Sequence, residues 1–161
     1  MSSGGDGMTV KQAIDSFLAQ KRIAIVGVSR GEKDFSRGLL REMRMRGYDT
    51  VPVNPNAEEI EGLKCFPSVR EIEPPVDGVL VLLPEKDVEG VVEECADAGI
   101  TRVWLHGVGM GTEPSESVKA LCEEKGIALI PGQCPYMFLT DTAWIHRLHG
   151  RILKWFGKYP A

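Results

Sequence analysis

The sequence lacks the features by which several large classes of protein are recognised. Its formal net charge is −4, with 19 Lys and Arg against 23 Asp and Glu, so it lacks the positive charge that a broad nucleic-acid surface requires. No apolar run is long enough to cross a bilayer, and the first eight residues have neither the charged nor the apolar region of a secretory signal. We therefore expect a cytoplasmic protein that binds no nucleic acid and has no transmembrane segment.

The chain also has no C-x-x-C pair. Its four cysteines, Cys65, Cys95, Cys122 and Cys134, are scattered, which in a chain without a signal peptide predicts free thiols. A nucleophilic thiol needs a base within reach and an electropositive setting. No motif fixes such a pair between Cys65 or Cys134 and His106, so we predict no catalytic residue.

A metal site has no better support. His146 and His149 lie three positions apart, whereas the usual helical zinc pair is four apart with a glutamate between them. We therefore predict no metal site.

What is present is an alternation of short apolar runs and amphipathic segments over 161 residues, a length typical of one domain. We predict a flexible N-terminus over residues 1–8 and a single domain over 9–161. The alternation favours an α/β, Rossmann-like, doubly wound sheet of about five parallel strands with helices on both faces. The predicted strands cover 22–28, 48–53, 78–83, 101–105 and 127–130, and the predicted helices begin near residues 9, 36, 67, 87 and 113.

Two of these helices have sequence signals at their ends. Thr9 and Gln12 resemble a capping box, and Val10, Ile14 and Phe17 should share the buried face of that helix with the neighbouring Leu18. For the second helix we expect Ser36 as the N-cap and Gly47 as the stop.

The loop after the first strand has the chemistry of a phosphate site. Gly27 lets the backbone come close to a ligand, and Ser29 and Ser36 can add hydroxyl donors. The N-terminus of the following helix offers free N–H groups and the positive end of its dipole. The alternative is an ordinary strand–helix turn with no ligand.

The dinucleotide fingerprint is nevertheless incomplete. Only Gly27 stands where that glycine pattern requires a glycine, and the second strand ends in Val53-Asn54-Pro55 rather than in an acid. A carboxylate at that point would hold the ribose hydroxyls of NAD. The strand ends as a group supply glycines, prolines, amides and apolar side chains, which suits holding a ligand better than transforming it.

Together these segments resemble the CoA-binding domain family. The resemblance rests on Gly27-Val28-Ser29, Val53-Asn54-Pro55-Asn56, Gly62-x-x-Cys65-Phe66-Pro67-Ser68, Pro84-Glu85, Val103-Trp104-Leu105 and Cys134-Pro135, in that order along residues 15–136. The family includes the N-terminal domain of the succinyl-CoA synthetase α subunit and small free-standing Rossmann-like proteins. The resemblance implies coenzyme A or acyl-CoA as the ligand, with phosphate at the first loop, the nucleoside at the second strand end and pantetheine along the rim.

The residues that the resemblance and the strand-end rule together make candidates for CoA binding are Gly27, Val28, Ser29, Arg30, Lys33, Ser36, Arg37, Val53, Asn54, Pro55, Leu83, Pro84, His106 and Cys134. The sequence departs from the family in two ways. Glu58 and Glu59 stand where synthetase domains tend to have a lysine for the 3′-phosphate, and His106 stands where small relatives often have glutamine. Arg30, Lys33 and Arg37 could compensate for the missing lysine, or they could be an ordinary solvated loop.

Two further segments keep several interpretations open. The loop at 107–112 is rich in glycine and is either a second phosphate site or a flexible connection. The tail from residue 136 to 161 predicts an amphipathic helix that packs on its own domain, forms a homodimer contact or attaches to a membrane surface.

We thus expect non-catalytic binding of CoA or acyl-CoA by a nucleotide-binding, succinyl-CoA synthetase-like domain. One alternative is a small NAD(P)-dependent oxidoreductase, and another is a CoA-binding module that acts with a separate catalytic partner.

Overall fold

The fold is known from a computed structural model that describes residues 8–31, 34–106, 113–132, 134–135 and 138. Its elements, in chain order, are α1 (Val10–Leu18), β1 (Arg22–Val26), α2 (Phe35–Met45), β2 (Asp49–Val53), β3 (Glu59–Ile60), β4 (Leu63–Lys64), the 3₁₀ turn η1 (Val69–Glu71), β5 (Gly78–Val81), α3 (Glu85–Asp97), β6 (Arg102–Leu105), α4 (Glu116–Lys125) and β7 (Ala128–Ile130). Within these ranges, no helix has the length and apolar character that would span a bilayer.

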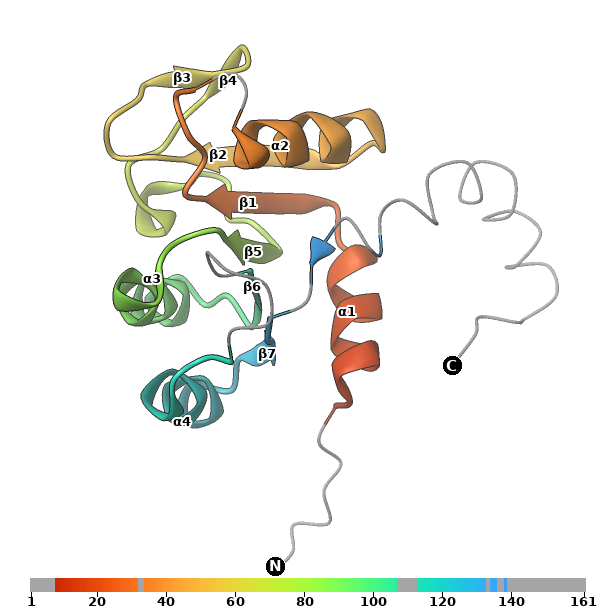
Figure 1. The fold of residues 1–161 in the computed structure, drawn as a ribbon, viewed down its shortest axis with the longest axis vertical. Helices are drawn as coiled ribbons and strands as arrows, with labels where there is room; N and C mark the ends of the chain where they lie inside the picture. Colours follow the sequence, from red (N-terminus) through yellow and green to blue (C-terminus); the bar gives the residue numbers. More distant parts are fainter. Residues whose placement is uncertain (1–7, 32–33, 107–112, 133, 136–137, 139–161) are drawn as a thin grey trace, which may run out of the picture.

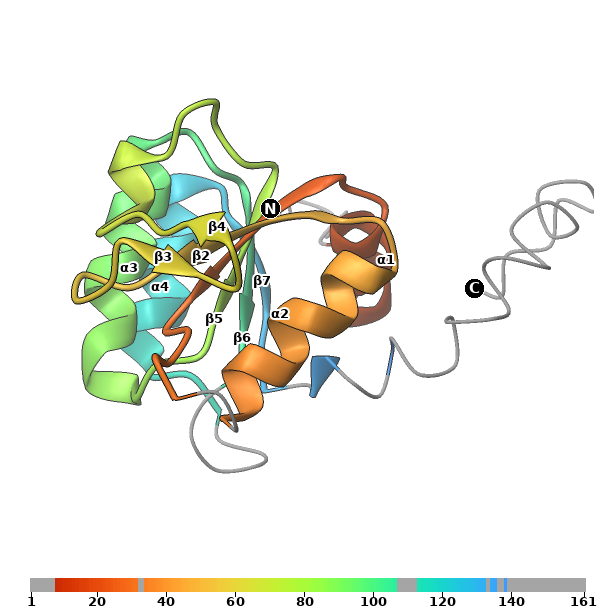
Figure 2. The same ribbon diagram turned by 90° about the horizontal axis from the view of Figure 1, so that it is seen from above.

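Five strands form one parallel sheet in the order β2-β1-β5-β6-β7. Helices α1 and α2 cover one face of this sheet, and α3 and α4 cover the other (Figures 1 and 2). The predicted doubly wound α/β sheet with helices on both faces is therefore confirmed. The chain moves outward from β1 to β2 and then returns to place β5 on the other side of β1, so the strand order reverses between β1 and β5.

Both faces of the central strands are buried because each face packs against a pair of helices. On the side of α1 and α2, Ile23 and Ile25 pack with Phe17 and with Trp104 of β6, and the rings of Phe17 and Trp104 meet edge to face at 5.4 Å. On the other side, the alternate residues pack against α3 and α4, with Val26 among them. This two-sided burial explains why β1 reads as an unbroken apolar run.

Several helix ends agree with the sequence. The capping box of α1 is formed by Thr9 and Gln12, as predicted. Gly47 follows α2 with a φ of 95°, a backbone conformation that favours glycine, and so it ends the helix as expected.

Other local predictions were wrong. The N-cap of α2 is Asp34, not Ser36, because the Asp34 carboxylate accepts the N–H of Ser36 in the first turn. Val10, the first residue of α1, is 43% exposed, and the buried residues of this helix are Ala13, Ile14 and Phe17. By contrast, the predicted turn around Gly62 is present, and β3 and β4, which flank it, pair as an antiparallel hairpin.

Two predicted segments lie outside the described residues: the glycine-rich loop at 107–112 and the amphipathic helix within 139–161. The division into a flexible 1–8 and a single domain over 9–161 stays a prediction.

Candidate functional site

A cavity of about 500 Å³ opens where the strand order reverses, at the carboxyl ends of β1, β2 and β5. This is the place where doubly wound sheets bind their ligands. Its described wall is made by three groups of residues. They are the end of β1 with the residues after it (Val26, Gly27, Val28, Ser29), the end of β2 with the residues after it (Val53, Asn54, Pro55, Asn56), and a third group from the other side (Pro67, Ser68, Leu83, Asp87, Gly90, Val91, Glu94).

Gly27 allows the loop after β1 to turn sharply beside β5. Its φ is 94°, and a Cβ at this position would lie 2.6 Å from the backbone oxygen of Leu82. Its N–H also donates to the oxygen of Val53 at 3.1 Å. Only glycine fits this backbone conformation and this close approach, so the chain can reach the cavity immediately after β1.

Two serine hydroxyls shape the loop from within. The Ser36 hydroxyl accepts the N–H of Ser29 at 2.8 Å and donates to the Asp34 carboxylate at 2.6 Å. The Ser29 hydroxyl accepts the N–H of Gly31 at 3.0 Å. Both hydroxyls were predicted to face a phosphate; Ser36 is instead buried inside the loop. Hydrogen bonds from Ser36 also lower the pKa of Asp34, whose carboxylate caps α2.

Arg37 holds the same loop from the side of the hairpin. Its side chain is buried, and its guanidinium donates to the carbonyl oxygens of Ser29 at 3.4 Å and Arg30 at 3.1 Å. It also forms an ion pair with Glu61, at the turn between β3 and β4, with an N–O distance of 3.4 Å. Arg41 pairs with the same carboxylate. Arg37 is therefore no solvated cation; it connects the loop to the hairpin.

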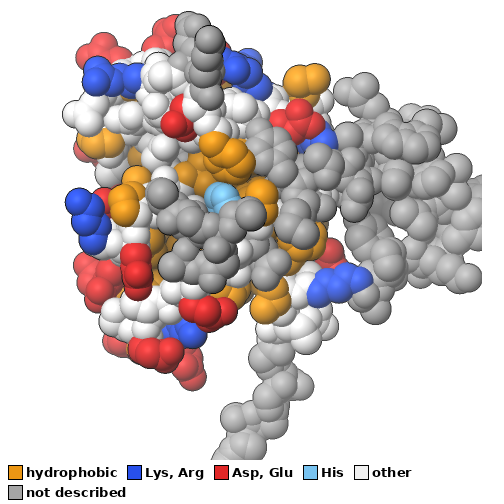
Figure 3. Space-filling model, in the orientation of Figure 1, with side chains coloured by type: hydrophobic (Ala, Val, Ile, Leu, Met, Phe, Trp, Pro, Cys, Tyr) orange, Lys and Arg blue, Asp and Glu red, His pale blue; other side chains and the backbone are white. Residues whose placement is uncertain are grey.

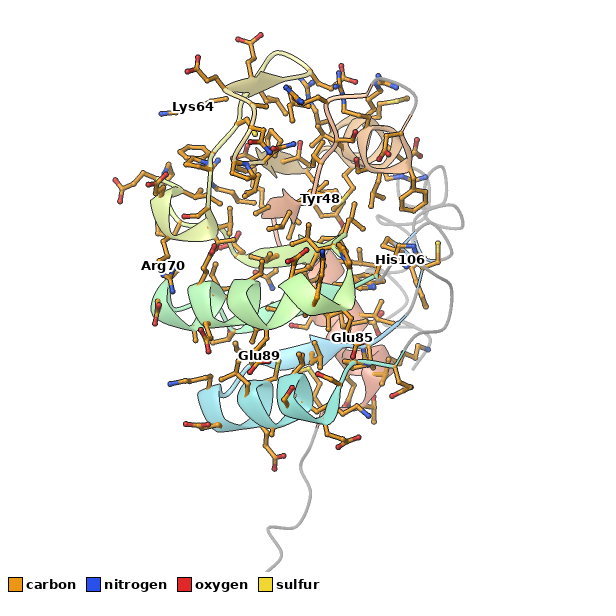
Figure 4. All side chains as sticks on the ribbon, turned by 60° about the vertical axis from the view of Figure 1, so that its left-hand side comes forward. Tyr48, Lys64, Arg70, Glu85, Glu89 and His106 are labelled. Carbon is orange, nitrogen blue, oxygen red and sulfur yellow. The ribbon has the colours of Figure 1, made fainter. Side chains whose placement is uncertain are left out.

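The other two cations of this stretch differ from Arg37. Arg30 is exposed, so its charge is open to solvent at the mouth of the loop. Lys33 lies outside the described residues. The sequence analysis did not consider Lys64 of β4, which is exposed (labelled in Figure 4). Its ammonium stacks over the ring of Phe66 at 4.9 Å.

Asn54 ties the ends of β1 and β2 together. Its side-chain amide donates to the backbone oxygen of Val28 at 2.8 Å, and its side-chain oxygen accepts the N–H of Asn56 at 2.7 Å. The thiol of Cys65 contacts the backbone oxygen of Asn54 at 3.6 Å. The amide thus holds the backbone of the cavity wall, and Pro55 lies exposed beside it.

Of the remaining predicted residues, Leu83, Pro84, His106 and Cys134, only Leu83 belongs to the described wall of this cavity. Leu83 lines the cavity, and Pro84 is the N-cap residue of α3. His106 follows β6, and its ring lies 5.3 Å from that of Phe35 at the start of α2; partial burial lowers the pKa of the imidazole. In Figure 3, the one described histidine is bordered by apolar side chains. Cys134 is half-buried, and the described walls of this cavity do not include it.

The strand-end rule missed the wall formed by η1 and α3. Glu94 lines the cavity from α3 and also accepts the N–H of Val69 at 3.1 Å, which fixes η1 against α3. Asp87 and Gly90 lie on the same side. Only the short Pro67-Ser68 motif pointed to this wall, because α3 reaches the cavity by packing rather than by following a strand.

A comparison with protein families decides the relationship. The model of the CoA binding domain matches residues 21–140, which contain all of the described cavity wall. The chain belongs to the CoA-binding domain family. The resemblance inferred from the sequence motifs is thereby confirmed.

Family members of two kinds are similar to this chain. The Pyrococcus furiosus acetate–CoA ligase (ADP-forming) II subunit alpha is 30% identical over 118 residues, which are 73% of this chain but 25% of the ligase subunit. The uncharacterized protein YneT of Bacillus subtilis is 32% identical over 114 residues, 71% of this chain and 82% of YneT. The chain thus spans about a quarter of the ligase subunit but most of the small relative.

Solved structures agree with this family. A conserved hypothetical protein from Pyrococcus furiosus matches with a TM-score of 0.65 and 34% identity, covering 76% of this chain and 99% of that protein. The redesigned PH1109 protein matches with a TM-score of 0.72 and 26% identity, over 90% of this chain and 95% of the other. Proteins of about this size therefore share the fold.

Proposed function

We propose that this protein binds coenzyme A or acyl-CoA in the 500 Å³ cavity and has no catalytic machinery of its own. The observation that supports this most strongly is the end of β2. Asn54 uses its side chain to bond Val28 and Asn56, and no acid stands there to hold the ribose hydroxyls of NAD.

The charges of the cavity wall favour one orientation of the nucleotide. Asp87 and Glu94 lie on the side of α3, where carboxylates repel phosphate but can accept hydrogen bonds from the amino group of adenine. The opposite side has Gly27, the loop after it and the exposed Arg30. We therefore place the adenine toward α3 and η1, and the phosphates toward the loop after β1.

Within this site the predicted residues have different tasks. Gly27, Ser29, Val53, Pro55 and Leu83 form walls that the ligand would touch, and the fully buried Val28 supports them from below. Ser36, Arg37 and Asn54 act as positioning residues, because their hydrogen bonds hold those walls in place. Arg30 is the described cation of this loop that is free to meet a phosphate.

A calorimetric titration with CoA, dephospho-CoA and NAD tests the proposal. We expect binding of CoA and much weaker binding of NAD. If Arg30 meets the 3′-phosphate, Arg30→Gln should lower the affinity for CoA and leave the affinity for dephospho-CoA unchanged. Lys11 is also exposed, so Lys11→Gln is the matched control and should change neither affinity. Binding of NAD without binding of CoA would refute the proposal and favour the NAD(P)-dependent oxidoreductase.

A second candidate is a CoA-binding module that acts with a separate catalytic partner. It is favoured by the ligase subunit, in which the region similar to this chain is a quarter of the polypeptide. Co-purification of the tagged protein with a ligase or acyltransferase component, and acyl-CoA turnover only in the mixture, would support this candidate. The homodimer contact predicted for the C-terminal segment remains a proposal, which the molecular mass in solution tests.

A further inference from the structure

A second cavity, of about 350 Å³, lies on the same face of the sheet as the first, on the other side of α3. Its floor is formed by the ends of β5 and β6, and its sides by α3 and α4. Leu83 lines both cavities. The two cavities therefore share part of their wall at Leu83, which lies between β5 and α3 at the carboxyl edge of the sheet.

The floor and sides of this cavity are apolar. Val88 of α3, Leu105 of β6 and Val118 of α4 are all buried, with exposed fractions of 6%, 6% and 1%. They come from three separate elements that converge on one space, so the cavity is built into the packing of the domain. Cavities of this size and lining are typical of sites for small apolar groups.

The polar groups at its rim are acidic. Glu85, in the first turn of α3, and Glu113, before α4, both line the cavity and are exposed, while none of the described lining residues is Lys or Arg. Lys119 pairs with Glu113 at 3.1 Å and so offsets only part of this charge. Figure 4 shows Glu85 on the side of the molecule where His106 lies, and Figure 3 shows acidic side chains gathered over α4. A ligand with a terminal carboxylate would meet repulsion here.

We propose that this second cavity binds the acyl chain of an acyl-CoA and selects uncharged aliphatic acyl groups over dicarboxylic ones. The inference rests on the proposed binding of CoA in the first cavity. The pantetheine would pass over Leu83, just before α3. This path would bring the thioester from the first cavity to the second.

The cavity volume sets the chain length that fits. A methylene group is about as large as a water molecule, whose share of liquid volume is roughly 30 Å³, so a six-carbon chain fits within 350 Å³. Each methylene that moves from water into an apolar site gains about 0.8 kcal/mol, which is roughly a fourfold gain in affinity. The affinity should therefore rise at least tenfold from acetyl-CoA to hexanoyl-CoA.

Calorimetric titration of the full chain with CoA, acetyl-CoA, butyryl-CoA, hexanoyl-CoA and succinyl-CoA is the test. Butyryl and succinyl groups have the same number of carbons, so their comparison isolates the terminal carboxylate. We expect succinyl-CoA to bind at least tenfold more weakly than butyryl-CoA. Glu85→Gln should reduce that difference, since it removes one of the two rim carboxylates.

Filling the cavity gives an independent test. Val118→Phe adds a ring inside it, and we expect the variant to bind CoA as the wild type does but to lose its preference for hexanoyl-CoA. Ala120→Phe places the same ring on the exposed side of α4 and should change nothing. If the thermal melt shows that Val118→Phe does not fold, Val88→Phe fills the same space from α3.

The outcomes separate the two proposals. Equal affinity for acetyl-CoA and hexanoyl-CoA, with CoA bound, overturns the acyl cavity and leaves the proposed function intact. A preference for hexanoyl-CoA that persists in a folded cavity-filling variant also overturns it. Failure of CoA itself to bind overturns the proposed function, and the acyl cavity with it.

Discussion

Replacing Asn54 with alanine should destabilise the protein more than a typical surface substitution. The alanine removes the donor to the Val28 oxygen and the acceptor for the Asn56 N–H, bonds of 2.8 and 2.7 Å. Val28 is fully buried, so its carbonyl oxygen loses a donor in a place that water cannot easily reach. The segments after β1 and β2 would then no longer be connected by a side chain.

The expected loss follows from these two contacts. A hydrogen bond contributes about 1 kcal/mol net, and a buried group left without a partner costs about 1–3 kcal/mol. We therefore expect Asn54→Ala to lower the free energy of unfolding by about 2–3 kcal/mol. For a chain of this size that corresponds to a melting temperature lower by roughly 4–12 °C. Urea unfolding followed by circular dichroism gives the free energy, and a thermal melt gives the shift.

Asn56→Ala is the matched control, because Asn56 is exposed and contributes its backbone N–H rather than its side chain to this contact. It should stay within about 0.5 kcal/mol of the wild type. Asn54→Asp keeps the acceptor but places a carboxylate oxygen against the Val28 oxygen, so the folded protein should raise the pKa of this acid. Its contribution to stability should then be present below the unfolded pKa of about 3.9 and be lost as the pH rises through the folded value. A stability of Asn54→Ala equal to that of the wild type would refute the role assigned to this side chain.

Three further predictions concern the backbone, the buried arginine and the thiols. Gly27→Ala adds both an unfavourable φ and a contact of 2.6 Å with a backbone oxygen, whereas Gly62→Ala adds only the unfavourable φ. Gly62→Ala should lower the free energy of unfolding by roughly 1–2 kcal/mol, and urea unfolding should show a larger decrease for Gly27→Ala. Arg37→Met removes the guanidinium that holds two loop carbonyls, and it should lower the free energy of unfolding by about 2–4 kcal/mol and weaken CoA binding; equal stability and affinity would contradict this. Burial raises the pKa of Cys95 to about 12 and that of Cys122 to about 11, from 9.0. The contribution of these buried neutral thiols to the free energy of unfolding is therefore fully present below pH 9 and is lost as the pH rises toward the folded values. Iodoacetamide labelling read by mass spectrometry at pH 8 should leave both thiols unmodified in the folded protein, and their rapid modification would contradict the burial.

The sequence predicted the sheet well because its strands are buried on both sides. The apolar runs at β1 and β5 have no competing periodicity, and the helices on either side of β1 have clear end signals, Thr9 at the start of α1 and Gly47 after α2. The cap of α2 was harder to assign. Asp34 and Ser36 are both good N-cap residues, and only the folded loop shows that the Ser36 hydroxyl is already engaged by Ser29 and Asp34.

The sequence predicted the part of the candidate site that follows the strands, but not the part that helix packing brings to the cavity. Residues that follow strands, such as Gly27 and Pro55, line the cavity because parallel strands end at one edge. Glu94 also lines it, yet it lies in the last third of α3, and no rule based on strand ends could select it. The packing of η1 against α3 brings that residue to the cavity.

The amino-acid sequence by itself determined the family, the parallel sheet and the absence of an acid after β2, because each of these depends on local sequence patterns: apolar runs, turn residues and the residues that follow each strand. Only the tertiary structure decided what the polar side chains do. Arg37 looked like a free cation, and the fold buries it between the loop and Glu61 of the hairpin. Asn54 looked like a ligand contact, and it bonds Val28 across the gap between two strands. Such roles depend on groups distant in the chain, which meet only when the sheet and its helices have packed.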